Sequence, residues 1–271
     1  MGPPARWPRV RSVAEIVYPP VLWLARGVFR ALGIQFSLTG QEHIPRTGGA
    51  VLASNHVSYL DFTFCGLTTF PQRLVRFMAK DAVFKHPVSG PLMRGMHHIP
   101  VDRTAGSAAF ESAVSALQAG EIVGVFPEAT ISRSFVLKDF KTGAARMAAA
   151  ADVPLIPMAT WGGQRIYTKG HKRDLSRGKA VGLAVGEPFH PAPDADPDEV
   201  TRELKVRIDV LLSGLQESYP QQPANDEDRW WLPVSLGGTA PTLEQATTMD
   251  AEEAAERAAR RAAERERRRA K

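Results

Sequence analysis

Residues 50–61, AVLASNHVSYLD, run from an apolar segment through a histidine to an aspartate five positions later. The apolar residues 50–53 are typical of a strand. Ser58 could cap a helix that begins at Tyr59, because a serine oxygen accepts from the free amides of a first helical turn. The stretch therefore predicts a strand joined by a short loop to a helix, which is the repeating unit of an α/β fold.

The alternation of strands and helices continues along the chain. Residues 105–119 have apolar side chains at helical spacing and end at Gly120, a residue suited to terminate a helix. Asp196, followed by Pro197 and acidic residues, predicts the start of another helix, and residues 142–151 are rich in alanine. Further strands are predicted at residues 75–78, 99–101, 122–126, 155–159 and 181–185. We expect an α/β fold with a mixed, largely parallel central sheet flanked by helices.

The composition limits the class of protein. The 271 residues, of which 44% are hydrophobic, fit one α/β domain with additions and exclude a wholly disordered chain. The single cysteine, Cys65, excludes an intramolecular disulfide and a cysteine-cluster zinc site, and it fits a reducing compartment. The net charge of +5 favours an anionic partner: nucleic acid, a phosphorylated substrate or an anionic membrane surface.

The N-terminal segment, residues 1–40, is basic and aromatic. Its arginines alternate with large side chains such as Trp7 and Trp23, a combination typical of a helix that lies in a membrane interface. A helix packed on the domain with solvated arginines is the alternative. Within the most apolar stretch, residues 16–36, the longest charge-free run is residues 16–25, which is far shorter than the roughly 20 residues of a spanning helix. We therefore predict an amphipathic membrane-surface helix and no transmembrane span.

Three further regions follow this segment. Residues 41–219 have the mixed pattern of a folded domain, and residues 220–249, rich in Pro, Gln, Thr and Gly, predict a linker. Trp230 and Trp231 within this linker could dock on the domain or on lipid. Residues 250–271 consist almost entirely of Ala, Glu and Arg, which predicts a charged, solvated helical tail; a membrane or partner contact is the alternative.

His56 and Asp61 can form a hydrogen-bonded pair if the chain turns between them. The carboxylate would fix one imidazole tautomer, and the free ring nitrogen could act as a general base. His97 and Asp102 have the same spacing, but their stretch is predicted to be extended, which places such side chains on opposite faces and about 16 Å apart. Only His56 and Asp61 therefore make a candidate dyad, and an ordinary loop histidine is the alternative.

Charged residues follow two of the predicted strands. Arg103 could bind a phosphate with its guanidinium or form a surface salt bridge. Glu128 could bond a substrate hydroxyl, orient neighbouring arginines or cap a helix. The adjacent His97 and His98 lack the cysteine partners and the spacing of a metal site, so we expect no metal.

Four short blocks occur in order: NHVSYLD at 55–61, VDR at 101–103, FPEAT at 126–130 and VPLIP at 153–157. Together they resemble the motifs of the PlsC-type 1-acyl-sn-glycerol-3-phosphate acyltransferases, which belong to the glycerolipid acyltransferase superfamily with an H-x4-D motif. The resemblance extends over roughly residues 20–215.

The third block departs from the family pattern. Ala129 stands where glycine is usual, Ile131 stands where arginine is usual, and Arg133 follows two positions later. This departure keeps open another acceptor for the same chemistry: glycerol-3-phosphate, another lysophospholipid or a glycolipid. A non-enzymatic membrane or nucleic-acid adaptor is a further alternative, disfavoured because both residues of the dyad are present.

The resemblance implies an O-acyltransferase of phospholipid biosynthesis. An acyl group passes from acyl-CoA or acyl-ACP to the sn-2 hydroxyl of 1-acyl-glycerol-3-phosphate (lysophosphatidate), and the product is phosphatidate. His56 would deprotonate the hydroxyl and Asp61 would orient His56, with no metal and no cofactor beyond the acyl thioester. The residues implied in substrate binding are Asn55, Arg103, Glu128, Thr130, Arg133 and Lys141.

The resemblance also implies partners and a location. The partners are an acyl donor thioester, coenzyme A or acyl carrier protein being the carrier, a lysophospholipid acceptor and an anionic membrane surface. No nucleic acid is expected. The implied location is the cytoplasmic face of the plasma membrane, where the chain would be peripheral or monotopic.

Overall fold

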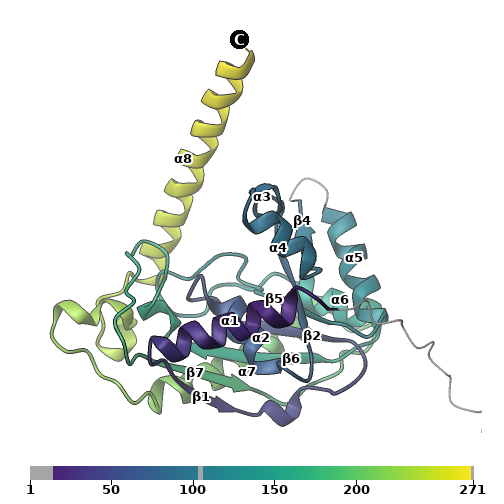
Figure 1. Ribbon diagram of the computed structural model, residues 1–271, viewed down its shortest axis with the longest axis horizontal. Coiled ribbons are helices and arrows are strands. Elements are labelled where there is room, and N and C mark those ends of the chain that lie inside the picture. Colours follow the sequence, from purple (N-terminus) through teal and green to yellow (C-terminus); the bar gives the residue numbers. More distant parts are fainter. Residues whose placement is uncertain (1–14, 103–105, 270–271) are drawn as a thin grey trace, which may run out of the picture.

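The computed structural model describes residues 15–102 and 106–269. Its centre is a 7-stranded sheet with the strand order β1-β7-β6-β2-β5-β3-β4 (Figure 1). The strands are β1 Gln35–Thr39, β2 Ala50–Ser54, β3 Val75–Lys80, β4 Ile99–Val101, β5 Ile122–Val125, β6 Leu155–Trp161 and β7 Ala180–Val185. Every predicted strand is present. The additional strand, β1, was not predicted because it is a short, exposed edge strand that mixes polar and apolar residues.

Most neighbouring strands run parallel. The exception is the pair β6 and β7, which is antiparallel, so β7 and its parallel neighbour β1 run against the other strands. This arrangement confirms the predicted mixed, largely parallel sheet. Because β2, β3, β4, β5 and β6 share one direction, their carboxyl ends lie at one edge, which is where open α/β sheets bind ligands.

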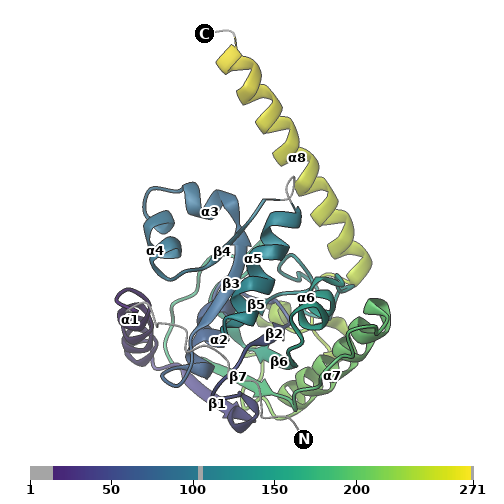
Figure 2. The ribbon, with the colours of Figure 1, turned by 90° about the vertical axis from the view of Figure 1, so that its right-hand side faces the viewer.

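Helices cover both faces of the sheet (Figure 2). The α-helices are α1 Tyr18–Ala31, α2 Asp61–Thr69, α3 Asp81–Lys85, α4 Ser89–Gly95, α5 Gly106–Gln118, α6 Gly143–Ala151, α7 Pro197–Glu217 and α8 Leu243–Arg269. The short 3₁₀ helices are η1 Gln41–His43, η2 Gly163–Arg165, η3 Glu227–Trp231 and η4 Val234–Leu236. Successive side chains of a strand point to opposite faces. Val51 and Ala53 therefore pack with α5, α6 and α7, whereas Ala50 and Leu52 pack with α1 and α2.

Helix α1 packs on the domain and also keeps an exposed apolar face. The helix begins at Tyr18, and Pro19 and Pro20 lie in its first turn, where prolines are tolerated. The Tyr18 hydroxyl donates to the carbonyl of Val75 at 2.8 Å. The opposite face exposes Trp23 and Leu24. Of the predicted N-terminal segment, residues 1–14 lie outside the described residues, and within the described ranges no helix combines the length and apolarity needed to cross a membrane.

The segment 220–249 packs against the domain, which differs from the predicted linker. Trp231 is 1% exposed and Ala240 is 4% exposed, and both belong to the core that α7 covers. Helix α8 then begins at Leu243, ahead of the predicted boundary at residue 250. A composition rich in Pro, Gln and Thr predicts a linker, but one buried tryptophan is enough to attach such a segment to a core.

Replacing Trp231 with alanine should lower the free energy of unfolding by about 3–5 kcal/mol, since the substitution leaves a large cavity in the core. Urea unfolding followed by circular dichroism measures this loss. Leu236→Ala in the same segment is the matched control, because Leu236 is 42% exposed and should change stability by about 0.5 kcal/mol or less. Equal stability of the Trp231 variant and the wild type would show that the segment is a free linker.

Candidate active site

His56 and Asp61 meet at the carboxyl end of β2. His56 lies in the loop that follows the strand, and Asp61 is the first residue of α2. The imidazole Nδ1 is 2.9 Å from the Asp61 Oδ2 atom, which is hydrogen-bond distance. The helix begins two residues later than predicted, and the Ser58 hydroxyl donates to the carbonyl of Tyr167 at 2.7 Å.

The Asp61 carboxylate is fully buried, at 0% exposure, and every partner donates to it. The backbone amides of Val57 and Ser58 both donate to Oδ2 at 2.7 Å. The hydroxyl of Thr160, on β6, donates to Oδ1 at 3.1 Å. A buried carboxylate can only accept hydrogen bonds, so in the contact with Asp61 the imidazole must be the donor. The proton of the neutral ring therefore lies on Nδ1. The other ring nitrogen, Nε2, is left able to accept a proton.

Aromatic stacking sets the plane of the His56 ring. The ring lies on Phe126 with centroids 4.2 Å apart and planes inclined by 17°. Phe126 in turn stacks on Phe77 with planes inclined by 8°. The His56 side chain remains 17% exposed and lines a cavity, so its position is restrained while its open edge stays accessible.

Glu128 lies beneath the His56 loop and does not line the cavity, which differs from the predicted contact with substrate. Its side chain is 5% exposed. Oε1 accepts from the backbone amide of His56 at 2.8 Å, and Oε2 accepts from the amide of Lys138 at 3.2 Å. Burial raises the pKa of Glu128 to about 7. The residue therefore supports the loop that carries the dyad.

The residue after Glu128 has an unusual backbone. Ala129 has a φ of 58°, in the left-handed region that favours glycine. This turn lets Glu128 point inward while Ala129 and Thr130 line the cavity. The conformation gives a physical reason for the glycine that is usual at this place in the family motif.

Asn55 is also buried, at 0% exposure, and does not line the cavity. Its side-chain amide donates to the carbonyl of Thr160 at 3.0 Å, and its Oδ1 accepts from the Thr160 amide at 2.8 Å. This two-way contact ties the end of β2 to β6. Both functional groups of the side chain are therefore engaged within the protein, and the role in substrate binding stays a prediction.

A cavity of about 1270 Å³ opens beside the dyad. Most of its lining is apolar, and polar residues accompany His56 at the sheet edge, which suits an amphiphilic ligand. Apolar residues from several helices and strands contribute to it, among them Val21, Phe62, Phe77, Met93, Met96, Phe110 and Met147. The His56 ring therefore faces a large space with mostly apolar walls.

The predicted binding residues are only partly brought together. Thr130 and Lys141 line the cavity. Arg133 does not: its guanidinium is paired with Asp250 and with Glu253 on α8. Arg103 lies outside the described residues.

Three participants were missed by sequence reasoning. Thr160 bonds to Asp61, and Lys169 and Arg257 line the cavity. None of them stands at a motif spacing, so only the folded chain brings them to the site.

In the adjacent histidine pair, His97 and His98, the ring of His98 is engaged within the protein. His98 is buried, and its Nδ1 accepts from the backbone amide of Phe77 at 3.1 Å. Burial lowers the pKa of His98 to about 3, so its ring stays neutral. Across residues 15–102 and 106–269, no group of three His, Cys, Asp or Glu side chains is placed to hold a metal ion.

Glu128→Gln should lower the free energy of unfolding by about 1–3 kcal/mol at pH 5, because the amide nitrogen of glutamine cannot accept from a backbone amide. The pKa of Glu128 rises from an ordinary 4.5 to about 7 on folding, so the folded state holds the proton longer. The stability contributed by this proton is present below pH 4.5 and is lost as the pH rises to about 7. The difference between the wild type and the variant should therefore shrink over this window.

Urea unfolding of both proteins at pH 5 and pH 8 measures this difference. Glu187→Gln is the control, because Glu187 is exposed and its replacement should change stability by about 0.5 kcal/mol or less. A difference between the wild type and Glu128→Gln that grows with pH would contradict the assignment.

Comparison with known proteins agrees with this geometry. Residues 35–161 match the family model described as Acyltransferase. The 1-acyl-sn-glycerol-3-phosphate acyltransferase of Bacillus subtilis is 31% identical over 203 residues, covering 69% of this chain and 96% of that protein. The enzyme of the same name from Limnanthes douglasii is 30% identical over 232 residues, covering 82% of this chain and 77% of that protein.

A solved structure shares the fold. The crystal structure of the 1-acyl-sn-glycerophosphate acyltransferase PlsC from Thermotoga maritima superposes with a TM-score of 0.64 at 23% identity, covering 75% of this chain and 80% of that one. The family match, the two relatives and the shared fold all indicate the same family of acyltransferases. The chain belongs to the PlsC-type 1-acyl-sn-glycerol-3-phosphate acyltransferase family and is an O-acyltransferase of that type.

Proposed function

We propose that this chain transfers an acyl group from an acyl thioester to the sn-2 hydroxyl of 1-acyl-glycerol-3-phosphate and so forms phosphatidate. One observation carries the proposal: the hydrogen-bonded pair of His56 and Asp61 at the wall of a largely apolar cavity. The names of the relatives support the choice of acceptor.

His56 acts as the general base in this mechanism. Its Nε2 takes the proton of the acceptor hydroxyl, and the oxygen attacks the carbonyl carbon of the thioester. A C–O bond forms, the C–S bond breaks, and the proton passes from the imidazolium to the departing thiolate. Asp61 stabilises the imidazolium through the Nδ1 contact of 2.9 Å. The nucleophile belongs to the substrate, so no acyl-enzyme is required.

The rigidity of the dyad favours the reaction. The donors to Asp61 come from the loop itself and from β6, and Phe126 restrains the ring plane. A catalytic group that is already oriented does not lose entropy in reaching the transition state, and placement of reactants contributes about 7–11 kcal/mol to well-oriented reactions. Thr130 and Lys141 at the cavity wall are the proposed contacts to the acceptor phosphate, together with Arg103.

One observation favours a second acceptor. Ile131 is 6% exposed and lines the cavity where the family pattern has an arginine, while Arg133 is paired with α8. A wall that is less basic at this position favours an acceptor other than lysophosphatidate. The same chemistry on glycerol-3-phosphate, another lysophospholipid or a glycolipid is therefore the second candidate, and the uncharged head group of a glycolipid fits an apolar Ile131 best.

The test is a thiol-release assay with purified protein, palmitoyl- or oleoyl-CoA, and lysophosphatidate, with phosphatidate identified as product. His56→Ala should lower the rate by about 10²–10⁴-fold, the usual contribution of a general base. His190→Ala is the matched control, because that ring is 49% exposed, pairs with Asp152 and does not line the cavity. It should retain the wild-type rate.

Other outcomes of the assay separate the alternatives. Full activity of His56→Ala would contradict the general base, and thiol release without an acceptor would identify a thioesterase. A preference for an unphosphorylated acceptor would support the second candidate. Replacing acyl-CoA with acyl-ACP in the same assay identifies the carrier.

We further propose that the chain works at an anionic membrane surface, on the cytoplasmic face, as a peripheral protein. The outer face of α1 exposes Trp23 by 56% and Leu24 by 70%, and the Arg26 guanidinium lies 5.2 Å from the Trp23 ring centroid. Val21 and Ala25 of the same helix line the cavity. A bilayer against α1 would therefore lie next to the path by which a lipid enters the site.

The double variant Trp23→Ser, Leu24→Ser should bind vesicles of anionic phospholipid at least about tenfold more weakly, because burial of each large apolar side chain contributes about 1.5–3 kcal/mol. Sedimentation with vesicles measures binding. The control variant carries Val206→Ser and Val210→Ser on α7, which are 63% and 67% exposed on the far side of the sheet. Equal losses in the two variants would place the contact elsewhere.

A further inference from the structure

The C-terminal helix α8 is attached to the domain by ion pairs at the edge of the catalytic cavity. Asp250 Oδ1 is 2.5 Å from the Lys169 ammonium and 3.2 Å from Nε of Arg133, and its Oδ2 is 2.5 Å from the ammonium of Lys138. Glu253 Oε2 lies 2.7 Å from Lys169 and 3.0 Å from Arg133. Two carboxylates on one face of α8 therefore hold it against three cations of the domain.

These ion pairs are shielded from solvent. The side chains of Lys169, Arg133 and Lys138 are 9%, 12% and 15% exposed, and Asp250 is 16% exposed. The Lys169 ammonium, which hydrogen-bonds to Glu253, lowers the pKa of that carboxyl to about 2, so Glu253 stays charged at neutral pH. A network of shielded, interlinked charges fixes a helix far better than separate exposed pairs do.

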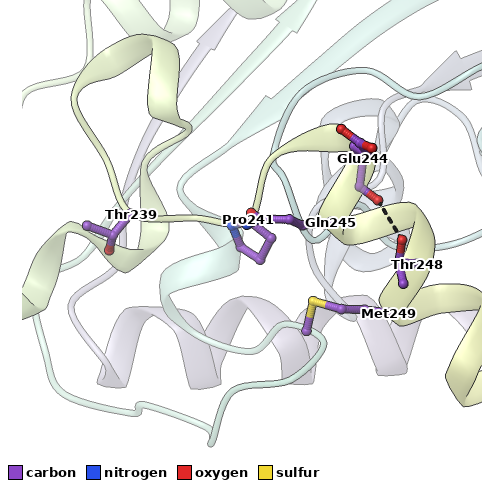
Figure 3. A pocket seen from close by; sticks show the side chains of 6 residues that line it. All are labelled: Thr239, Pro241, Glu244, Gln245, Thr248 and Met249. Atoms are coloured by element: carbon purple, nitrogen blue, oxygen red, sulfur yellow. Dashed lines mark hydrogen bonds between the residues drawn. The ribbon is translucent and has the colours of Figure 1, made fainter.

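The base of α8 is partly buried, with Ala246 at 0% exposure, and a hollow lies beside it (Figure 3). Residues 239 and 241 lie beside the first turns of the helix and share a hollow with Glu244, Gln245, Thr248 and Met249. Farther along, α8 extends away from the body (Figures 1 and 2). Only the part of α8 between its base and its free end can therefore contact the cavity.

Arg257 occupies this segment. It lies one turn beyond Glu253, forms an ion pair with it, and lines the catalytic cavity with Lys169 and Lys141. Glu253 thus binds Lys169 and Arg133 through Oε2 and Arg257 through Oε1. The Arg257 side chain is 54% exposed, which leaves room for a further ligand.

The charge of the cavity lining is positive. Lys141, Lys169 and Arg257 are among the cations that line the cavity, and Glu111 is the acidic side chain among the described residues of the lining. A guanidinium presents paired donors that match a phosphate group, which makes Arg257 the best-suited of these side chains.

We propose that Arg257 is a phosphate-binding residue of this active site, delivered by a helix that lies outside the family-matched residues 35–161, and that Asp250 and Glu253 are its positioning residues. The proposal rests on the proposed acyl transfer and adds the residue that recognises the charged end of a substrate. The ligand is a phosphate group, which is present both in the lysophosphatidate acceptor and in an acyl-CoA donor.

The main test compares Arg257→Gln with Arg260→Gln, a matched control on the exposed part of the same helix that does not line the cavity. In the acyl-transfer assay, Arg257→Gln should raise the KM for one phosphorylated substrate about three- to tenfold with kcat changed less than twofold, and Arg260→Gln should match the wild type. A raised KM for lysophosphatidate assigns the acceptor phosphate, and a raised KM for acyl-CoA assigns the donor.

Two phosphate-free substrates complete the comparison. Monoacylglycerol as acceptor and an acyl-N-acetylcysteamine thioester as donor should be used equally well by Arg257→Gln and the wild type. Unchanged KM values for both phosphorylated substrates would overturn the proposal. An equal loss with the phosphate-free substrates would also overturn it, because that pattern indicates a general disturbance of the site.

The positioning residues have their own test. Asp250→Asn should raise the same KM, because it loosens the attachment of α8. The KM of the double variant Asp250→Asn, Arg257→Gln should not exceed that of Arg257→Gln alone, because the two substitutions act on the same contact with the phosphate. Full additivity would contradict positioning through Asp250. Thermal unfolding of each variant confirms that the domain is folded.

A binding measurement separates this proposal from the proposed reaction. Calorimetric titration of lysophosphatidate and of coenzyme A into His56→Ala, with and without Arg257→Gln, needs no turnover. Weaker binding of one ligand to the Arg257 variant supports the phosphate contact even if the wild type shows no acyl transfer. Equal binding of both ligands refutes the contact even if acyl transfer is confirmed.

Discussion

The hydrogen bonding of the buried Asp61 carboxylate is the constraint on which the rest of the site depends. A carboxylate at 0% exposure would cost several kcal/mol without partners. Its donors belong to different parts of the chain: the loop after β2 provides the amides of Val57 and Ser58, and β6 provides the Thr160 hydroxyl. The parallel pairing of β2 and β6 brings these parts together, so the sheet order itself determines whether His56 has an oriented partner.

The polar motif residues divide into those that reach the cavity and those that support them. His56 and Thr130 line the cavity, whereas Asn55 and Glu128 are buried and bond to backbone groups. Such polar groups are retained in a core because they are fully satisfied there and hold one loop conformation. Changes in these residues should therefore act first on stability, and on activity through the position of the ring.

The sequence was sufficient for the buried strands β2 to β7 and for the contact between His56 and Asp61, because apolar runs and a short loop are local properties, whereas the exposed edge strand β1 has no such signal. The direction of the Glu128 side chain was not predictable, since it depends on the left-handed turn at Ala129. The packing of Trp231 was not predictable either, because a linker-like composition gives no information on long-range contacts. For the same reason the sequence gives no sign that Arg133, Lys138 and Lys169 pair with α8. In the sequence alone they are indistinguishable from independent surface charges.

The C-terminal part of the chain completes the electrostatics of the cavity. Trp231 attaches residues 220–249 to the core, and the ion pairs of Asp250 then direct α8 along the cavity edge as far as Arg257. The apolar interior and the exposed face of α1 suit acyl chains, whereas a cationic edge suits a phosphate. One cavity therefore combines an apolar interior with cationic side chains and the His56 ring, which is the set of contacts that an amphiphile with a phosphate group needs.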